Sequence, residues 1–290
     1  MTIQLGIFFA LACAVATNLG FLYKHRGACA AATVDIKHPL RSARALFASR
    51  WFAIGMLVAV GAWGLHVAAL ALAPMSVVQV VLSGGVVLLA VMAERLFGFE
   101  VGPRQWWGLG LTAAGLILLG VTLPGGGGAH SHFSQAGMIA FEGGLVGMGG
   151  LLIMGPRLGG PAEHHGVMLA GAAGILFGVS DVAIKAITGM VGGSGIEGFL
   201  NPWTLVAVSA SIAAFYASAR GLQDGEAVPV IAVTGSAANV AGIAGGILVF
   251  GDPLPADPVA LVLQCAAFLM VVVAAALTPA PVRVAAATAG

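Results

Sequence analysis

The sequence predicts an all-α integral membrane protein with about nine transmembrane helices. Of its 290 residues, 59% are hydrophobic and only 8% are charged, and the mean hydropathy is +1.02. A soluble domain carries roughly a quarter charged residues, so this composition excludes a soluble fold. The 44 glycines fit a helical bundle, because small residues let helices approach closely where lipid supplies no hydrophobic drive for association.

Nine stretches are long and apolar enough to be membrane spans, since a helix needs about 20 such residues to cross the hydrocarbon core. Only Ala73-Pro74 separates the second stretch from the third, and this predicts a tight hairpin because proline is tolerated at a helix start. The predicted spans cover residues 3–23, 50–72, 75–93, 105–123, 136–155, 167–188, 202–219, 227–249 and 258–278.

These spans divide the chain into two parts. Residues 1–123 form a first repeat of four helices, which includes a long basic loop over residues 24–49. Residues 136–278 form a second part of five helices. A glycine-rich loop over 124–135 joins the two parts, and the small-residue tail over 279–290 is predicted to be disordered.

The basic residues predict the orientation of the chain in the membrane. Cytoplasmic loops collect Lys and Arg, and six of the twelve basic residues lie between Lys24 and Arg50. With that segment cytoplasmic, the N-terminus is outside, the C-terminus is cytoplasmic, and only Lys185 lies toward the outside. An added or missing span would reverse every later loop, so the fit also favours nine spans. We expect a multi-pass protein of the cell (plasma) membrane.

A weak internal similarity relates the two halves. Lys24 closes the first span as Lys185 closes the sixth, and Gln79 and Asn239 occupy related places in the third and eighth spans. The related spans run in opposite directions, which is the pattern of an inverted repeat. Inverted repeats are common in secondary transporters, whose substrate site lies near the midplane where the halves meet.

Short motifs in both halves resemble the drug/metabolite transporter superfamily, which is also called EamA-like. They are Ala71-Leu72-Ala73-Pro74-Met75-Ser76, Ala93-Glu94-Arg95, Gly108-Leu109-Gly110, Gly178-Val179-Ser180-Asp181 and Gly221-Leu222-Gln223. Within that superfamily the chain is most similar to the NIPA-type magnesium transporters, through Lys24, Ala73-Pro74, Lys185 and Pro229. The resemblance implies an inverted-repeat helical bundle and transport of magnesium.

Six polar side chains within the predicted spans are candidates for substrate binding or coupling. A charged group inside a membrane costs on the order of 3 kcal/mol and usually faces the interior of the bundle. The six are Glu142, Asp181, Lys185, His66, Gln79 and Asn239. For His66, Gln79 and Asn239 the alternative is a structural hydrogen bond between helices.

The acidic residues are the candidates for a metal site. Asp181 and Lys185 lie four residues apart and therefore on one helix face. They form either a structural ion pair or a gated pair, in which a cation or proton competes for Asp181. Glu142 and Asp181 together are the candidate metal ligands.

Several functions are compatible with this pattern, and we favour a transporter of a small solute that works by alternating access. A divalent-cation transporter, with magnesium as the cation, is the close alternative, and a non-transporting accessory subunit is a third. We do not expect an enzyme, since no nucleophile, base or metal-ligand set converges in the sequence. Nothing indicates a cofactor or nucleic-acid binding. The expected partners are the lipid bilayer and the solute or cation, and a homodimer is one assembly that the sequence allows.

Overall fold

The computed structural model describes residues 2–35, 37–97, 103–122, 132–159, 164–252 and 254–277, among which no strand occurs. The described residues form ten α-helices. The helices are α1 (Thr2–Cys29), α2 (Pro39–Phe47), α3 (Arg50–Leu72), α4 (Met75–Phe97), α5 (Pro103–Thr122), α6 (Gln135–Met154), α7 (His165–Ser194), α8 (Pro202–Asp224), α9 (Ala227–Leu248) and α10 (Pro258–Leu277).

Over the described residues, six helices are long and apolar enough to cross a membrane, namely α1, α3, α6, α7, α8 and α9. The protein is therefore an all-α membrane protein with multiple spans. Helices α4, α5 and α10 overlap the other three predicted spans, and their assignment as spans stays a prediction.

Some helices are longer than the predicted spans. An apolar run identifies the part of a helix that lies in the membrane, and the helix itself can continue beyond it. Helix α1 continues beyond residue 23 to Cys29, and α8 continues to Asp224 with an Arg220–Asp224 pair one turn apart. Helix α2 occupies part of the loop predicted over 24–49. Most of the predicted glycine-rich loop and the predicted tail over 279–290 lie outside the described residues.

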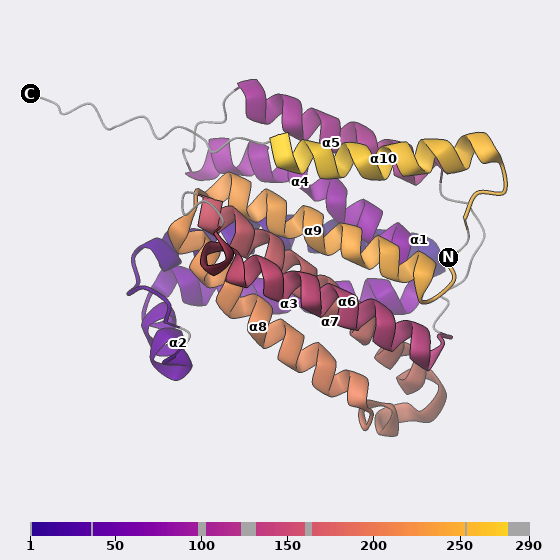
Figure 1. Ribbon diagram of the computed structural model, residues 1–290, viewed down its shortest axis with the longest axis horizontal. Helices are drawn as coiled ribbons and strands as arrows, with labels where there is room; N and C mark the ends of the chain where they lie inside the picture. The colour runs from indigo at the N-terminus through magenta and orange to yellow at the C-terminus, as the bar shows by residue number, and fades with distance from the viewer. Residues whose placement is uncertain are drawn as a thin grey trace, which may run out of the picture.

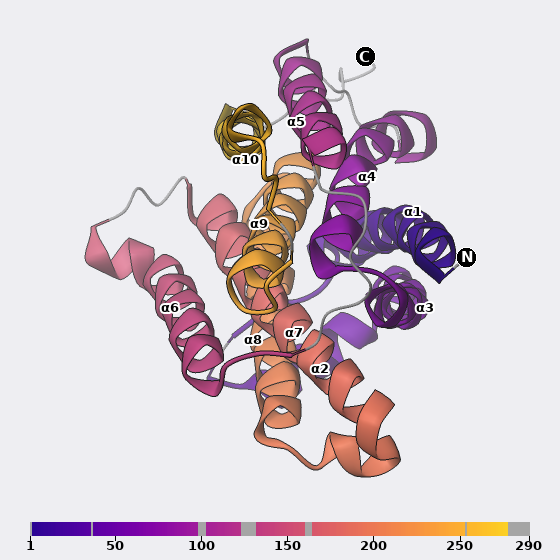
Figure 2. The same ribbon diagram turned by 90° about the vertical axis from the view of Figure 1, so that its right-hand side faces the viewer.

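The packing of the first four long helices is repeated by the last four. Helix α1 packs against α3 and α4, and α7 packs in the same way against α8 and α9. Helix α4 contacts α9, and α5 contacts α10, so the corresponding helices meet each other across the bundle (Figures 1 and 2). Helix α6 packs mainly on α7 and stands to one side of the bundle in Figure 2. This is the pairing that two repeats plus one additional helix would give.

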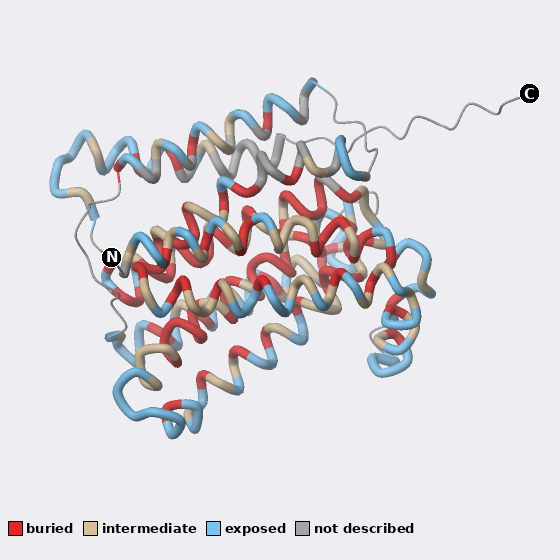
Figure 3. The backbone as a smooth tube through the Cα atoms, turned by 180° about the vertical axis from the view of Figure 1, so that it is seen from behind, coloured by how far each residue is buried: buried red, intermediate tan, exposed pale blue. Residues whose placement is uncertain are grey.

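Burial follows the same arrangement, with the buried residues gathered along the central helices (Figure 3). Close crossings there depend on glycine. A Cβ on Gly174 of α7 would lie 2.7 Å from the Cβ of Ala237 in α9 and would also clash with the Thr234 carbonyl. Small residues therefore set how closely α7 and α9 approach, as expected for helix packing in a membrane.

Helix α2 lies at the end of the bundle opposite the N-terminus (Figure 1). The segment that leads into it is tied to the end of α8, where the Gln223 side chain donates to the carbonyls of Ala28 and Ala32 and accepts from the Val34 N–H. The Tyr216 hydroxyl donates to the Pro39 carbonyl. The basic segment is thus a structured part of this end of the bundle.

Candidate functional site

Four of the six candidate residues line one cavity. His66, Gln79, Asp181 and Asn239 reach it from α3, α4, α7 and α9, and α1 completes its wall. We call this space of about 200 Å³ the polar cavity. Its polar lining consists of Cys13, Thr17, Asn18, Lys24, His66, Gln79, Asp181, Thr234 and Asn239.

Asp181 is the only acidic residue in the described lining of the polar cavity, and it has two partners. Its Oδ1 lies 3.0 Å from His66 Nε2, although the ring N–H is not aligned for a hydrogen bond. Its Oδ2 accepts a hydrogen bond of 3.1 Å from Gln79 Nε2. The carboxylate therefore joins α7 to α3 and α4, and its neighbours there are the His66 imidazole and the Gln79 amide.

Close helix packing places these side chains together. Gly178 of α7 lies where a Cβ would clash with Ala241 of α9, and Asp181 follows it by one turn of the same helix. At the α4–α9 crossing, a Cβ on Gly242 would lie 2.7 Å from the Gln79 side chain. Since both glycines leave room for a neighbour, α7, α9 and α4 meet around the cavity.

Two oxygens in the cavity lining have no partner. Within the described structure, Gln79 Oε1 and Thr234 Oγ1 are buried without a hydrogen bond. A buried polar group without a partner costs free energy, so such groups usually have a reason to be retained. Asn18 also lines the cavity, but its amide donates to the carbonyls of Ala14 and Gly85 and so links α1 to α4. The lining therefore offers unused oxygen ligands beside one carboxylate.

Lys185 does not lie in the polar cavity, and the predicted Asp181–Lys185 pair is not formed in this structure. The fully buried Lys185 ammonium donates to the carbonyls of Leu70, at 2.7 Å, and Ala73, at 3.2 Å. These carbonyls end α3 and have no partner within the helix, and this need outweighs the attraction along the face of α7. Lys185 thus caps the α3–α4 hairpin.

Asp252 caps the start of α4 in the same hairpin. Its Oδ2 accepts a hydrogen bond of 2.9 Å from the Ser76 N–H at the start of α4. The buried carboxylate is also close enough to Lys185 for its charge to act on the ammonium. A buried cation and a buried anion therefore satisfy the two helix ends that meet at Ala73-Pro74.

Glu142 also lies away from the polar cavity. It belongs to α6, its exposure is 4%, and both carboxylate oxygens are buried with no hydrogen-bond partner in the described structure. The structure does not bring Glu142 and Asp181 together, so the predicted two-carboxylate metal site is absent from this conformation. Among the described residues, no three His, Cys, Asp or Glu side chains gather into a metal-binding group.

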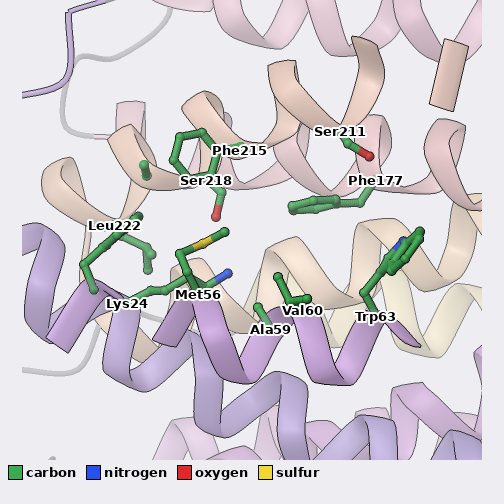
Figure 4. Close-up of a pocket in the computed structure, with 12 residues that line it drawn as sticks. Lys24, Met56, Ala59, Val60, Trp63, Phe177, Ser211, Phe215, Ser218 and Leu222 are labelled. Atoms are coloured by element: carbon green, nitrogen blue, oxygen red, sulfur yellow. The ribbon is translucent and has the colours of Figure 1, made fainter. Parts of the chain in front are cut away.

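A second space, which we call the apolar chamber, adjoins the polar cavity. It has a volume of about 310 Å³ and lies between α3 and α8, with Phe177 of α7 and Lys24 of α1 in its wall (Figure 4). Lys24 and Phe177 also line the polar cavity, so the two spaces meet there. The other lining residues of the apolar chamber are Phe52, Met56, Ala59, Val60, Trp63, Ser211, Phe215, Ser218, Ala219 and Leu222.

Sequence reasoning did not select Lys24 or Thr234 as site residues. Lys24 looked like the basic end of the first span, because the apolar run stops there while the helix continues. Thr234 gave no signal because a hydroxyl can bond within its own helix. The usable signal for Lys24 was its correspondence to Lys185 in the internal repeat.

The chain is similar in sequence to a known protein. Over 279 residues, which are 92% of this chain and 79% of the relative, the sequence is 24% identical to a protein of Arabidopsis thaliana named probable magnesium transporter NIPA9. The similarity thus extends over most of the helical bundle. No family model matches the chain, and no solved structure matches it.

Proposed function

We propose that this protein is a membrane transporter of a divalent cation of the magnesium type and that the cation binds at Asp181 in the polar cavity. The observation that carries the proposal is the single carboxylate beside the unpartnered oxygens of Gln79 and Thr234. The likeness to a probable magnesium transporter over 92% of the chain supports it independently.

A site with one carboxylate suits the coordination chemistry of magnesium better than that of calcium. Magnesium takes six oxygen ligands, keeps several of its waters and binds proteins through one or two carboxylates. Since one water occupies about 30 Å³ in the liquid, six waters need about 180 Å³. A cavity of about 200 Å³ has room for an ion that retains most of its hydration shell. The amide and hydroxyl oxygens would then bind those waters.

Cation binding would require Asp181 to change partners. In this conformation the carboxylate faces His66 and accepts from Gln79. An arriving divalent cation must displace the imidazole from the carboxylate. This displacement is hardest when the imidazole is protonated and positive. Rotation of the Gln79 amide would present its oxygen in place of its N–H group. His66 thus balances the charge of Asp181 when no cation is bound.

The two lysines of the repeat support alternating access. Lys185 closes the α3–α4 hairpin, which the predicted orientation places at the outer side. Lys24, at the corresponding place in α1, lies beside the end of α8, and its ammonium points into the apolar chamber instead (Figure 4). The end of the bundle at Lys185 is therefore closed, whereas the corresponding end at Lys24 is open. We propose that the lysines exchange these roles when the halves of an inverted repeat move.

Glu142 would carry a coupling proton in this scheme. A buried, ionised carboxylate with no partner is costly, whereas a protonated one is not, so we propose that it is protonated here. The ionisable groups on α7, against which α6 packs, are engaged elsewhere: Asp181 with His66, Lys185 with α3, and His165 with Asp224. Helix α9 carries no charged residue in its sequence. Movement of α6 away from α7 would expose the carboxyl and release its proton.

A small organic solute is the second candidate substrate, and the apolar chamber favours it. Its aromatic wall includes Phe52, Trp63 and Phe215, and it joins a cavity with a few polar anchors, which is the usual form of a small-molecule site. A solute with an amine would place that group at Asp181. This candidate shares the carboxylate with the cation proposal but also requires the chamber.

Calorimetric titration of the purified protein with MgCl₂ in detergent tests the proposed ligand. We expect saturable binding to the natural protein and to Asp257→Asn, which changes an exposed loop carboxylate outside both spaces. Binding to Asp181→Asn should weaken by about tenfold or more, because the substitution removes the carboxylate charge that attracts the cation. Equal binding to all three proteins would place the magnesium elsewhere, and no binding to any would favour the organic solute.

A further inference from the structure

The apolar chamber has a mouth that faces the bilayer. Two residues of its α3 wall, Val60 and Trp63, are 60% and 55% exposed, so the chamber is open along α3. Leu57 on α3 and Ile212 on α8 are also exposed. Because α3 and α8 are both long and apolar enough to be spans, their exposed apolar side chains meet lipid in a membrane.

A lone buried cation lies inside that opening. Lys24 is 9% exposed, and its side chain extends into the chamber (Figure 4). Its Nζ lies 3.7 Å from the centre of the Phe21 ring. Within the described structure, no carboxylate or carbonyl accepts a hydrogen bond from it. An unpaired buried charge is costly, and an aromatic ring offsets only part of that cost. The corresponding Lys185, by contrast, has two carbonyl partners.

The surroundings of the lysine match an amphiphilic anion. The chamber supplies one positive charge, two hydroxyls from Ser211 and Ser218, and an otherwise apolar and aromatic wall. The Ser211 hydroxyl is hydrogen-bonded to that of Ser180, whereas the Ser218 hydroxyl lies on the Lys24 side of the chamber (Figure 4). A ligand for this space therefore needs a small anionic head and an apolar body.

We propose that the apolar chamber binds an anionic membrane lipid, which enters between α3 and α8 and pairs its headgroup phosphate with Lys24. The acyl chain would lie along the chamber wall and leave through the mouth beside Val60 and Trp63. The bilayer supplies the lipid directly because the mouth opens within the apolar belt. A bound headgroup would hold Lys24 away from the end of α8 and so would favour the present conformation.

This lipid site does not depend on the cation proposal. The lipid proposal concerns Lys24 and the apolar chamber, whereas the cation proposal concerns Asp181 in the polar cavity. The cation proposal can therefore fail while the lipid proposal holds. The lipid site predicts a preference among lipids in protein that carries no magnesium, so its test needs no transport measurement.

Native mass spectrometry of protein extracted from bilayers of equal phosphatidylglycerol and phosphatidylcholine tests the site. We expect the natural protein to retain phosphatidylglycerol in preference, and Lys24→Met to reduce that preference by about tenfold, the effect of one hydrogen bond to a charged group. Lys24→Arg should keep it, as should Lys37→Met, which removes a basic residue from the exposed loop before α2. Folding is not at risk, since an unpaired buried charge is replaced by an apolar side chain of similar length.

A second measurement leaves Lys24 unchanged. Brominated acyl chains quench tryptophan fluorescence, and the Trp63 share is the difference between the natural protein and Trp63→Phe. We expect brominated phosphatidylglycerol to quench that share more strongly than brominated phosphatidylcholine. Equal quenching by the two lipids, or an equal loss of lipid preference in Lys24→Met and Lys37→Met, would overturn the proposal.

Discussion

His66 of α3 and Asp181 of α7 face each other across the polar cavity, with the imidazole Nε2 3.0 Å from the carboxylate Oδ1. The pair brings together two residues from opposite halves of the chain at the place where α1, α3, α4, α7 and α9 meet. Any cation that binds Asp181 must share it with, or take it from, the imidazole.

Magnesium and protons should compete for Asp181 through His66. Protonation makes the imidazole positive and strengthens its hold on the carboxylate, so magnesium affinity should fall as the pH falls from mildly alkaline to mildly acidic. His66→Gln should flatten this dependence, because an amide does not gain a charge. The measurement is the apparent magnesium dissociation constant of both proteins across that pH range. If His66→Gln keeps the full pH dependence, the proton acts at another group.

Lys185→Met should destabilise the protein, although Lys185 does not line the polar cavity. The substitution leaves the Leu70 and Ala73 carbonyls without their donor and Asp252 without a nearby cation. Each buried group left unpaired costs about 1–3 kcal/mol, so we expect a clearly lower midpoint of thermal unfolding in detergent. The double variant Lys185→Met/Asp252→Asn should recover part of the loss. An unchanged midpoint in Lys185→Met would show that the hairpin does not need this cap.

Glu142 should react with dicyclohexylcarbodiimide, a reagent that modifies protonated carboxyl groups in apolar surroundings. Its two buried, unpartnered oxygens predict a neutral carboxyl in apolar surroundings, whereas Asp257 is exposed to water in a loop and should stay unmodified. Peptide mass spectrometry after brief labelling at neutral pH measures both sites. Labelling at Asp257 but not at Glu142 would contradict the proposed proton site. Glu142→Gln, which mimics the protonated form, should fold as stably as the natural protein.

The close approach of α7 and α9 should depend on Gly174. Gly174→Ala places a methyl group against Ala237 and the Thr234 carbonyl, and such overpacking typically costs 1–3 kcal/mol. Gly143→Ala on α6 is the matched control, because nothing lies within 4 Å of its added Cβ. Thermal unfolding of the two variants compares them directly. Similar unfolding midpoints would mean that α7 and α9 separate easily. This would contradict the conclusion that their close packing forms part of the polar cavity.

The sequence predicted the helical membrane fold well because hydropathy and charge act over the whole chain. Arg50–Leu72 and its turn into α4 agree with the predicted hairpin to the residue, since Ala73-Pro74 is a local signal. Helix α2 was missed because its short, basic sequence reads as a loop when only long apolar runs are sought. The ends of α1 and α8 were missed for the same reason.

The candidate site was predicted in part. His66, Gln79, Asp181 and Asn239 were selected as rare polar groups in apolar spans, and they line one cavity. The sequence could not show that Lys185 turns toward α3, because spacing along α7 reveals its neighbours on that helix but not those across the bundle. Whether these residues bind substrate stays a prediction.

Magnesium uptake into proteoliposomes, followed with an enclosed magnesium-sensitive dye, measures whether the protein transports magnesium by way of Asp181. The natural protein and Asp257→Asn should give saturable uptake above empty liposomes, and Asp181→Asn should lose most of it. An accessory subunit would give no flux in any sample, although all three proteins are folded. Uptake by Asp181→Asn at the rate of the natural protein would contradict the assignment of the cation to the polar cavity.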